Sequence, residues 1–198
     1  MNKQGCLAIF CILLLSLSLL TGCLSNAWTG ATLIYDRHNL YKKLSDYQLA
    51  ALASHAMFHD FVFKRKDSLV DLAVFNGDIL LAGHVPSKDL RQLAYQRLAA
   101  LKGYRRIYLQ LDISNQPPDN LTDSWITTKI RTLIFADSEI NPQAFKVITS
   151  DQVVYLMGDV RPQQASKVIT IARKTKGVQR VVKIFNYYNL SKKAAEDS

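Results

Sequence analysis

The sequence predicts an α+β protein made of two tandem αββαβ modules, each a three-stranded mixed sheet covered on one face by two helices. An internal repeat is the first basis for this prediction, because residues 76–85 align with 151–160 around a shared glycine and valine. The second basis is spacing, since Gly83 precedes Gly103 by 20 residues and Gly158 precedes Gly177 by 19. A helix fits between the two glycines of each pair, and a basic, β-branched strand follows it.

Residues 1–22 predict a lipoprotein signal peptide that is not part of the fold. One charge at Lys3 precedes an apolar run over 6–20, and the run ends in Leu20-Thr21-Gly22-Cys23. Small residues before the cysteine leave the backbone open to a peptidase, and the thiol is the nucleophile that takes diacylglycerol. A plain transmembrane anchor is the alternative, but the run is shorter than the ~20 residues that a bilayer span needs. We expect N-acyl diacylglycerol on Cys23 and no cofactor.

The expected mature chain, 23–198, keeps no free thiol, because Cys6 and Cys11 leave with the signal peptide and Cys23 carries lipid. Residues 23–45 read as a polar, lipidated linker. Leu24 follows the cysteine where an aspartate would favour inner-membrane retention in enteric bacteria. By analogy with those bacteria, we expect a lipid anchor on the periplasmic face of the outer membrane.

The first module is expected at 46–113. Asp46 is a candidate N-cap for a helix over 46–59, and Asn76-Gly77 predicts a hairpin between strands 69–75 and 79–85 because both positions tolerate positive φ. A second helix over 87–101 and a strand from Tyr104 follow. The stripe expected to be buried on the first helix is Leu49, Leu52, Ala53, Ala56 and Met57.

The second module is expected at 123–190, after a linker at 114–122 that paired prolines stiffen. Its turn at 150–152 lacks glycine, so the turn geometry stays open. A helix over 162–175 has proline at its start and Gly177 beyond its end. The charged tail at 191–198 is expected to be disordered.

The first helix of the second module carries the candidate site. A helical wheel assigns Ile126, Ile130, Leu133 and Ile134 to the core, so that two aromatic residues face away from it beside cations. Tryptophan suits a membrane interface, and cations there meet anionic headgroups. The alternative, equally open from the wheel, is that the aromatics pack on the sheet or the other module. The candidate phospholipid-binding residues are Trp125, Thr128, Lys129, Arg131, Thr132 and Phe135.

Charge favours the second module as the anion-binding one. Residues 123–198 contain 12 Lys or Arg and 7 Asp or Glu, a net charge of +5, whereas 46–118 contain 9 and 7, a net charge of +2. A basic field attracts any polyanion, but a periplasmic location argues against nucleic acid. A solvated face without a partner is the alternative for Lys167, Arg173, Lys174 and Lys176.

Motifs for enzyme chemistry are missing from the sequence. It has no glycine-rich phosphate loop, no Gly-x-Ser-x-Gly elbow and no His-Glu-x-x-His helix. His55 and His59 are spaced to share a metal with Asp60 or His84, but a histidine pair without a placed third ligand is usually incidental. We expect no catalytic residue, no metal site and no small-molecule substrate.

The duplicated αββαβ unit with its central glycine resembles the BON domain (bacterial OsmY and nodulation). Together with the lipidation motif, it resembles the dual-BON outer-membrane lipoproteins of the DolP type. The similarity is densest at 123–131, DSWITTKIR, and at 154–158, VYLMG, and it is weak in the first copy beyond Gly83 and Gly103. The resemblance implies a non-enzymatic protein that binds anionic phospholipid through the first helix of its second BON domain.

The same resemblance implies a role in envelope integrity, a place at division sites and an association with the β-barrel assembly machinery. Two hypotheses follow. In the first, the lipid anchor and the second BON helix together hold the protein on anionic membrane. In the second, the protein is a non-enzymatic adaptor for the outer-membrane assembly machinery, which it binds through its sheet edges and its aromatic face.

Overall fold

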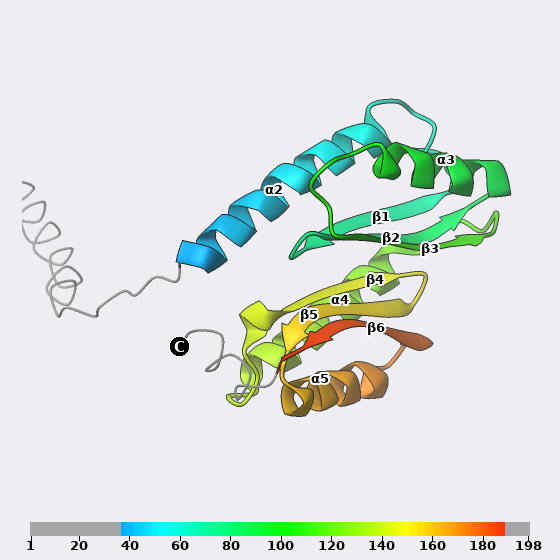
Figure 1. Cartoon of the computed structure of the whole chain (residues 1–198). Helices are drawn as coiled ribbons and strands as arrows, with labels where there is room; N and C mark the ends of the chain where they lie inside the picture. Colours follow the sequence, from blue (N-terminus) through cyan, green and yellow to red (C-terminus); the bar gives the residue numbers. More distant parts are fainter. Residues whose placement is uncertain (1–36, 189–198) are drawn as a thin grey trace, which may run out of the picture. The chain divides into compact units, whose positions relative to one another are not determined.

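The computed structural model describes residues 37–188, with side chains from Lys43 onward. The expected signal peptide at 1–22, the lipidation site Cys23 and the tail at 191–198 lie outside the described residues. Figure 1 shows two successive modules, each with one sheet and two helices. The described helices lack the length and apolarity needed to cross a bilayer.

The first module has the predicted αββαβ order. Its elements are α2 (Arg37–Phe58), β1 (Leu69–Phe75), β2 (Asp78–Val85), α3 (Lys88–Ala99) and β3 (Arg106–Ile113). Strand β2 is central, because it pairs antiparallel with β1 and parallel with β3. Ser87 caps α3 by accepting a hydrogen bond from the amide of Leu90. The predicted three-stranded mixed sheet is confirmed.

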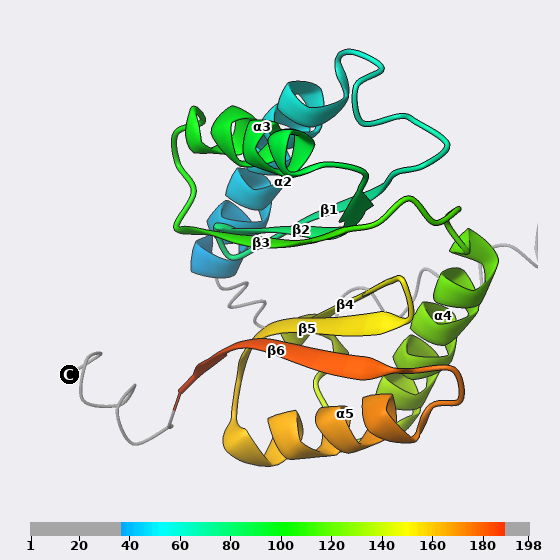
Figure 2. The ribbon, with the colours of Figure 1, turned by 90° about the vertical axis from the view of Figure 1, so that its right-hand side faces the viewer.

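The second module repeats this topology. Its elements are α4 (Asn120–Ala136), a short 3₁₀ turn (Pro142–Ala144), β4 (Phe145–Ser150), β5 (Val153–Val160), α5 (Pro162–Lys174) and β6 (Arg180–Tyr187). Strand β5 lies between antiparallel β4 and parallel β6. In Figure 2, α4 and α5 lie on the same side of this sheet. Each sheet is thus covered on one face by two helices, as predicted.

Each pair of helices closes its own hydrophobic core. In the first module α2 and α3 pack on side chains of β1, β2 and β3, and in the second α4 and α5 pack on β4, β5 and β6. The fully buried contributors from the first module include Met57, Ile79, Leu81 and Leu98, and those from the second include Ile126, Ile130, Leu156 and Val168.

The opposite faces of the two sheets pack against each other. A third cluster joins Ala73, Leu80 and Ala82 of the first module to Tyr155 and Met157 of the second. Strand β2 is therefore buried along its whole length, since helices cover one face and the second sheet covers the other. The relative packing of the modules had been left open by the sequence.

Polar contacts close one end of this sheet-on-sheet interface. His84 on β2 is 2% exposed, and its Nδ1 lies 2.8 Å from Oδ2 of Asp151. Its Nε2 lies 2.8 Å from the carbonyl oxygen of Gln116 in the linker. The Ser150 hydroxyl donates to Oδ2 of Asp71 at 2.6 Å. These contacts join β1, β2 and the linker to the β4–β5 turn.

The first helix differs from its prediction. Helix α2 begins at Arg37 rather than Asp46, so the expected linker 23–45 is helical in its last part and Asp46 is not an N-cap. The Asp46 carboxylate instead accepts hydrogen bonds from the amides of Asn76 and Gly77, at 2.6 and 2.8 Å. Leu52 was expected in the core and is 55% exposed, because the buried line follows the i, i+4 spacing of Leu49, Ala53 and Met57.

Helix α4 also starts earlier than predicted. It begins at Asn120, and the N-cap is Asp119, whose side chain accepts from the amide of Thr122 at 3.1 Å. The expected linker 114–122 therefore ends at the cap. Asp123 lies inside the helix, and its carboxylate accepts from the amides of Asp151 and Gln152, both at 2.8 Å. This contact repeats the one that Asp46 makes.

The two hairpin turns have the same geometry despite different residues. Asn76 and Gly77 have φ of 47° and 78°, and Asp151 and Gln152 have φ of 51° and 60°. Two consecutive positive φ values are typical of the type I′ turn, which matches the twist of a hairpin. The geometry left open at 150–152 is thus that of the first copy.

Candidate functional site

Three buried isoleucines position the outward face of α4. Ile126, Ile130 and Ile134 are at most 3% exposed and pack on the second sheet, as predicted. Leu133 was also assigned to the core, and this prediction is wrong because the side chain is 37% exposed and lies beside α5. Three points of attachment over two turns leave α4 little freedom to rotate.

The six side chains predicted to bind lipid do not share one direction. Trp125 and Lys129 line a groove between α4 and α5. Thr128, Thr132 and Phe135 are exposed on the outer side of the helix. The Thr132 hydroxyl donates to the Thr128 carbonyl at 2.9 Å, so it satisfies its own helix. Phe135 is the large apolar group among these three, and Leu121, seven residues before Thr128, is also exposed on this side.

Arg131 points towards a third side of α4. Its Nη2 donates to the Val147 carbonyl on β4 at 2.7 Å, although the residue as a whole is exposed. The guanidinium therefore fastens α4 to β4, next to the hydrogen bond from Thr127 to Thr149. Its remaining donors are the part of Arg131 that an anion can reach.

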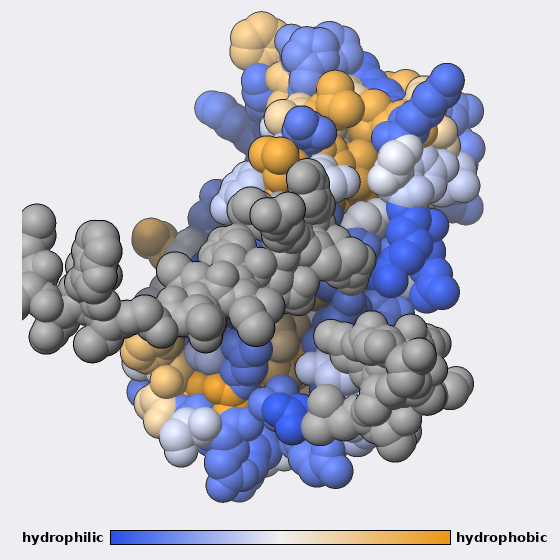
Figure 3. Space-filling model, turned by 60° about the vertical axis from the view of Figure 1, so that its left-hand side comes forward, coloured by the Kyte–Doolittle hydropathy of each residue, from blue (hydrophilic) through white to orange (hydrophobic). Residues whose placement is uncertain are grey.

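The exposure of the two aromatic residues bears on the alternative left open by the helical wheel. Phe135 is 80% exposed, so it does not pack on the sheet or on the first module. Trp125 is 51% exposed and lines the groove beside α5. Figure 3 shows that apolar side chains on one face of the molecule occur in small groups among hydrophilic ones.

The groove between α4 and α5 has a volume of about 400 Å³. The end of α5 supplies most of its second wall, which the sequence analysis missed. Trp125, Lys129 and Leu133 follow one i, i+4, i+8 line along α4, and this spacing was the available signal. The groove is lined by Trp125, Lys129, Leu133, Thr170, Ile171, Lys174, Thr175 and Lys176.

Gly177 brings the segment after α5 close to α4. Its φ is +89°, and a Cβ at this position would lie 3.2 Å from Cδ1 of Ile126. A larger residue would therefore be strained and crowded. The Thr175 hydroxyl donates to the Ile171 carbonyl at 2.9 Å and closes the last turn of α5. The groove is thus a fixed feature of the fold.

Lys167 differs from the three lysines that line the groove. Lys167 lies near the carboxylates of Asp137 and Glu139, and the hydrogen bond to Glu139 raises the pKa of this lysine. Lys129, Lys174 and Lys176 form no ion pair within residues 43–188. Three of the lysines without an ion pair therefore lie at the groove.

A comparison with protein families matches the BON domain twice, at residues 64–115 and 122–187. The chain belongs to the BON family. The second match begins in the first turn of α4 and runs to the end of β6, and the first begins after α2.

Two curated relatives resemble this BON protein. Over 184 residues it is 29% identical to the outer membrane lipoprotein DolP of Haemophilus influenzae, covering 89% of this chain and 94% of the relative. Over 125 residues it is 31% identical to the 21 kDa hemolysin of Actinobacillus pleuropneumoniae, covering 62% of this chain and 64% of the relative. The chain is a dual BON-domain protein of the DolP type.

Among solved structures, the chain is similar to CdsD, a structural protein of the type III secretion system of Chlamydia trachomatis. The TM-score is 0.27 at 11% identity, with 75% of this chain and 96% of that chain covered. This likeness is too weak to carry a functional argument.

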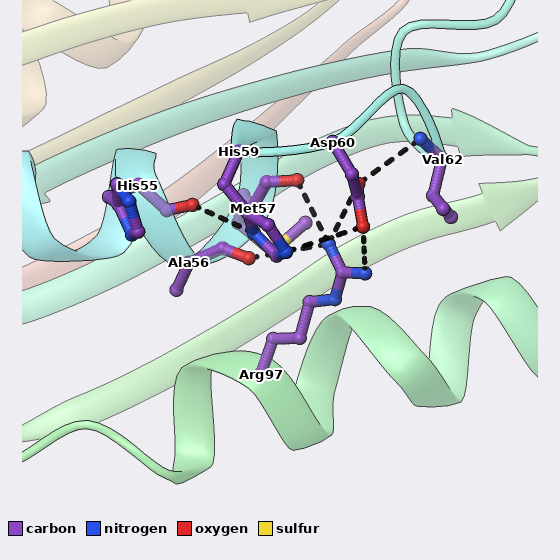
Figure 4. A network of polar contacts seen from close by, with 7 residues as sticks. All are labelled: His55, Ala56, Met57, His59, Asp60, Val62 and Arg97. Carbon is purple, nitrogen blue, oxygen red and sulfur yellow. Dashed lines mark hydrogen bonds and ion pairs between the residues drawn. The ribbon is translucent and has the colours of Figure 1, made fainter.

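The histidines of the first BON domain do not meet at one site. His55 and His59 stack on α2 with ring centroids 5.7 Å apart, whereas His84 is buried against the second domain. Arg97 holds Asp60 through two hydrogen bonds of 2.6 and 3.1 Å, as Figure 4 shows. This guanidinium lowers the pKa of the Asp60 carboxyl to about 2. Within the described residues, no three His, Cys, Asp or Glu side chains come together as metal ligands.

Arg97 has a structural role at the end of α2. It donates to the carbonyls of Ala56 and Met57, both at 3.3 Å, in addition to its bonds with Asp60. The last turn of a helix has unpaired carbonyls, and a cation there also complements the helix dipole. Asp60 and Arg97 therefore join α2 to α3.

Proposed function

We propose that this protein is a non-enzymatic lipoprotein of the outer membrane that binds anionic phospholipid on the periplasmic side through α4. The observation that carries the proposal is the pair of exposed aromatics, Trp125 and Phe135, on a helix fixed by three buried isoleucines. Lys129 lies on the same helix beside Trp125. Similarity to an outer membrane lipoprotein and the motif at Cys23 support the location.

The chemistry of the face suits a membrane interface. Aromatic rings are favoured at the headgroup level, and each basic residue near an anionic surface contributes about 1 kcal/mol. Such a contact is weak alone. Acyl chains on Cys23 would keep the second BON domain at high effective concentration near the bilayer, so that weak docking becomes effective. In this proposal the anchor provides residence on the membrane, docking selects anionic regions, and both support envelope integrity.

The test is vesicle binding by the mature chain with Cys23→Ala, so that acyl chains do not contribute. Vesicles containing phosphatidylglycerol should bind, and vesicles of phosphatidylcholine alone should bind at least tenfold more weakly. Trp125→Glu should reduce binding to the anionic vesicles at least tenfold, because it places a carboxylate at the interface. Co-sedimentation measures the binding, and circular dichroism checks the fold.

Tyr47→Glu is the matched control, because Tyr47 is an aromatic residue 76% exposed on α2 of the first domain. It introduces the same charge and should leave vesicle binding unchanged. Unchanged binding by a folded Trp125→Glu variant would refute docking through α4. In that case crosslinking from α4 to the β-barrel assembly machinery in cells would favour the adaptor function. In cells, the full-length protein with Cys23→Ala should be lost from the membrane fraction.

A further inference from the structure

The groove between α4 and α5 has an apolar lining. Trp125, Leu133 and Ile171 are among its lining residues, and its volume of about 400 Å³ lies at the low end of ligand pockets, which span roughly 300–1,000 Å³. It is open to solvent along its length. A space of this size suits one alkyl chain rather than a whole two-chain lipid.

The charged residues of the groove indicate which polar group an alkyl-chain ligand would carry. Lys129, Lys174 and Lys176 line the groove, and no carboxylate does. Asp123, two residues before Trp125, is buried and accepts from the amides of the β4–β5 turn. Asp137 and Glu139, beyond Leu133, pair with Lys167. An apolar slot with cations fits an amphiphile that has an alkyl tail and a negatively charged head.

The groove is preformed. On the α4 side, Ile126 and Ile130 are fully buried below it, and on the α5 side Val168 and Ala172 are fully buried. A ligand therefore need not reorganise the core, which lowers the cost of binding.

We propose that this groove takes up one acyl chain of an anionic phospholipid, with the phosphate on the lysine side. The inference rests on the proposed function and adds a specific site to it. Docking on a bilayer surface requires only α4, through Phe135 on its outer side and the exposed part of Trp125. Uptake of a chain requires the α5 wall, Thr170, Ile171 and the two lysines beyond them.

The test is binding of decyl phosphate below its micelle concentration, measured by calorimetry on the mature chain with Cys23→Ala. This probe has one alkyl chain and one phosphate. Decyl phosphate should bind, and both inorganic phosphate and the uncharged decyl glucoside should bind at least tenfold more weakly. Thr170→Trp should weaken binding of decyl phosphate at least tenfold, because the indole fills the groove from an exposed position.

Ser166→Trp is the matched control, one turn earlier on α5, exposed and outside the groove lining. It should bind decyl phosphate as the parent does. Leu133→Ser is a second variant, which removes apolar lining and should also weaken binding. Phe135→Glu should leave decyl phosphate binding unchanged while it reduces vesicle binding.

Failure of the parent chain to bind decyl phosphate would overturn the inference, and so would equal binding by Thr170→Trp and Ser166→Trp. Neither result affects vesicle docking, which Phe135→Glu tests separately because Phe135 lies outside the groove lining. Equal affinity for decyl phosphate and decyl glucoside would also overturn it, because the lysines would then not recognise the phosphate.

Discussion

Asp71 is an acidic residue at the junction of the two BON domains. Burial raises the pKa of its carboxyl above the ordinary 3.8, and the nearby carboxylates of Asp123 and Asp151 raise it further. The hydrogen bond from Ser150 acts in the opposite direction. Because the folded state holds the proton more tightly than the unfolded state, stability falls as pH rises from 3.8 through the raised pKa. At neutral pH, the ionised Asp71 therefore destabilises the fold.

We predict that Asp71→Asn raises the free energy of unfolding at pH 7. The amide oxygen still accepts from Ser150, and the buried charge is gone. The gain should shrink at pH 4, because the raised pKa leaves more of the wild-type carboxyl protonated in the folded state there than at pH 7. Thermal melts at the two pH values measure the difference. Asp112→Asn is the control, since the Asp112 side chain is 77% exposed and should change little. A lower melting temperature at pH 7 would contradict this account.

At the scale of elements, the first helix of each domain is fastened to a hairpin turn by one aspartate. Asp46 accepts from both amides of the β1–β2 turn, and Asp123 accepts from both amides of the β4–β5 turn. These amides need the carboxylate as acceptor, because in a turn with positive φ both N–H groups point away from the hydrogen bonds between the two strands. The repeated unit is thus a helix, a turn and a carboxylate that joins them.

We predict that Asp123→Ala destabilises the protein by about 1–3 kcal/mol, because two partly buried amides lose their acceptor. Asp123→Asn should cost less, since one carbonyl oxygen remains. Asp46→Ala should behave like Asp123→Ala in the other domain. Urea unfolding at pH 7 measures each cost.

The reference variant is Asp119→Ala, which removes an ordinary N-cap and should cost about 1 kcal/mol. If Asp123→Ala cost no more than a surface substitution, the carboxylate would not be holding the turn.

At the scale of the whole described region, the two BON domains share an interface of two sheet faces. Apolar side chains form its centre, and Lys146 on β4 donates to the Val74 carbonyl on β1 at 3.0 Å. Burial lowers the pKa of this lysine. His84 contributes both ring nitrogens, one towards the Asp151 carboxylate and one towards the Gln116 carbonyl. The linker and the second domain thus meet on one buried side chain.

We predict that His84→Ala weakens this coupling and destabilises the protein by about 1–3 kcal/mol, because a carboxylate and a carbonyl lose their partner. In a Trp28→Phe background, so that Trp125 is the one fluorescent tryptophan, urea unfolding followed by fluorescence and by circular dichroism should give coincident transitions in the parent protein. In the variant the two transitions should separate. His55→Ala, an exposed histidine on α2, is the control. Coincident transitions and unchanged stability in His84→Ala would contradict the coupling.

Local signals predicted most of the fold. Asn76-Gly77 indicated its hairpin because the turn depends on the φ of two neighbouring residues. The starts of α2 and α4 were missed, because Asp46 looks like a cap and the second module was expected to begin at Asp123. Both carboxylates instead bind turns that are distant along the chain. The continuous apolar run of β2 indicated that both faces of this strand are buried. It did not indicate that the second sheet covers one of those faces.

The candidate site was predicted in part. The i, i+4 spacing indicated which side of α4 faces the sheet, because that depends on helix geometry alone. It did not separate Trp125, which lines the groove, from Arg131, which bonds to β4. That division depends on which elements lie to either side of the helix.

The sequence by itself determined the repeat, the mixed sheets, the hairpins and the expectation of lipid on Cys23, because each depends on residues close together in the chain. Only the tertiary structure decided that the sheets pack face to face, that His84 joins the domains, and that Lys174 and Lys176 lie across a groove from Trp125. These features depend on contacts between distant segments. Such contacts form where burial and hydrogen bonding are satisfied together, and spacing along the chain does not specify them.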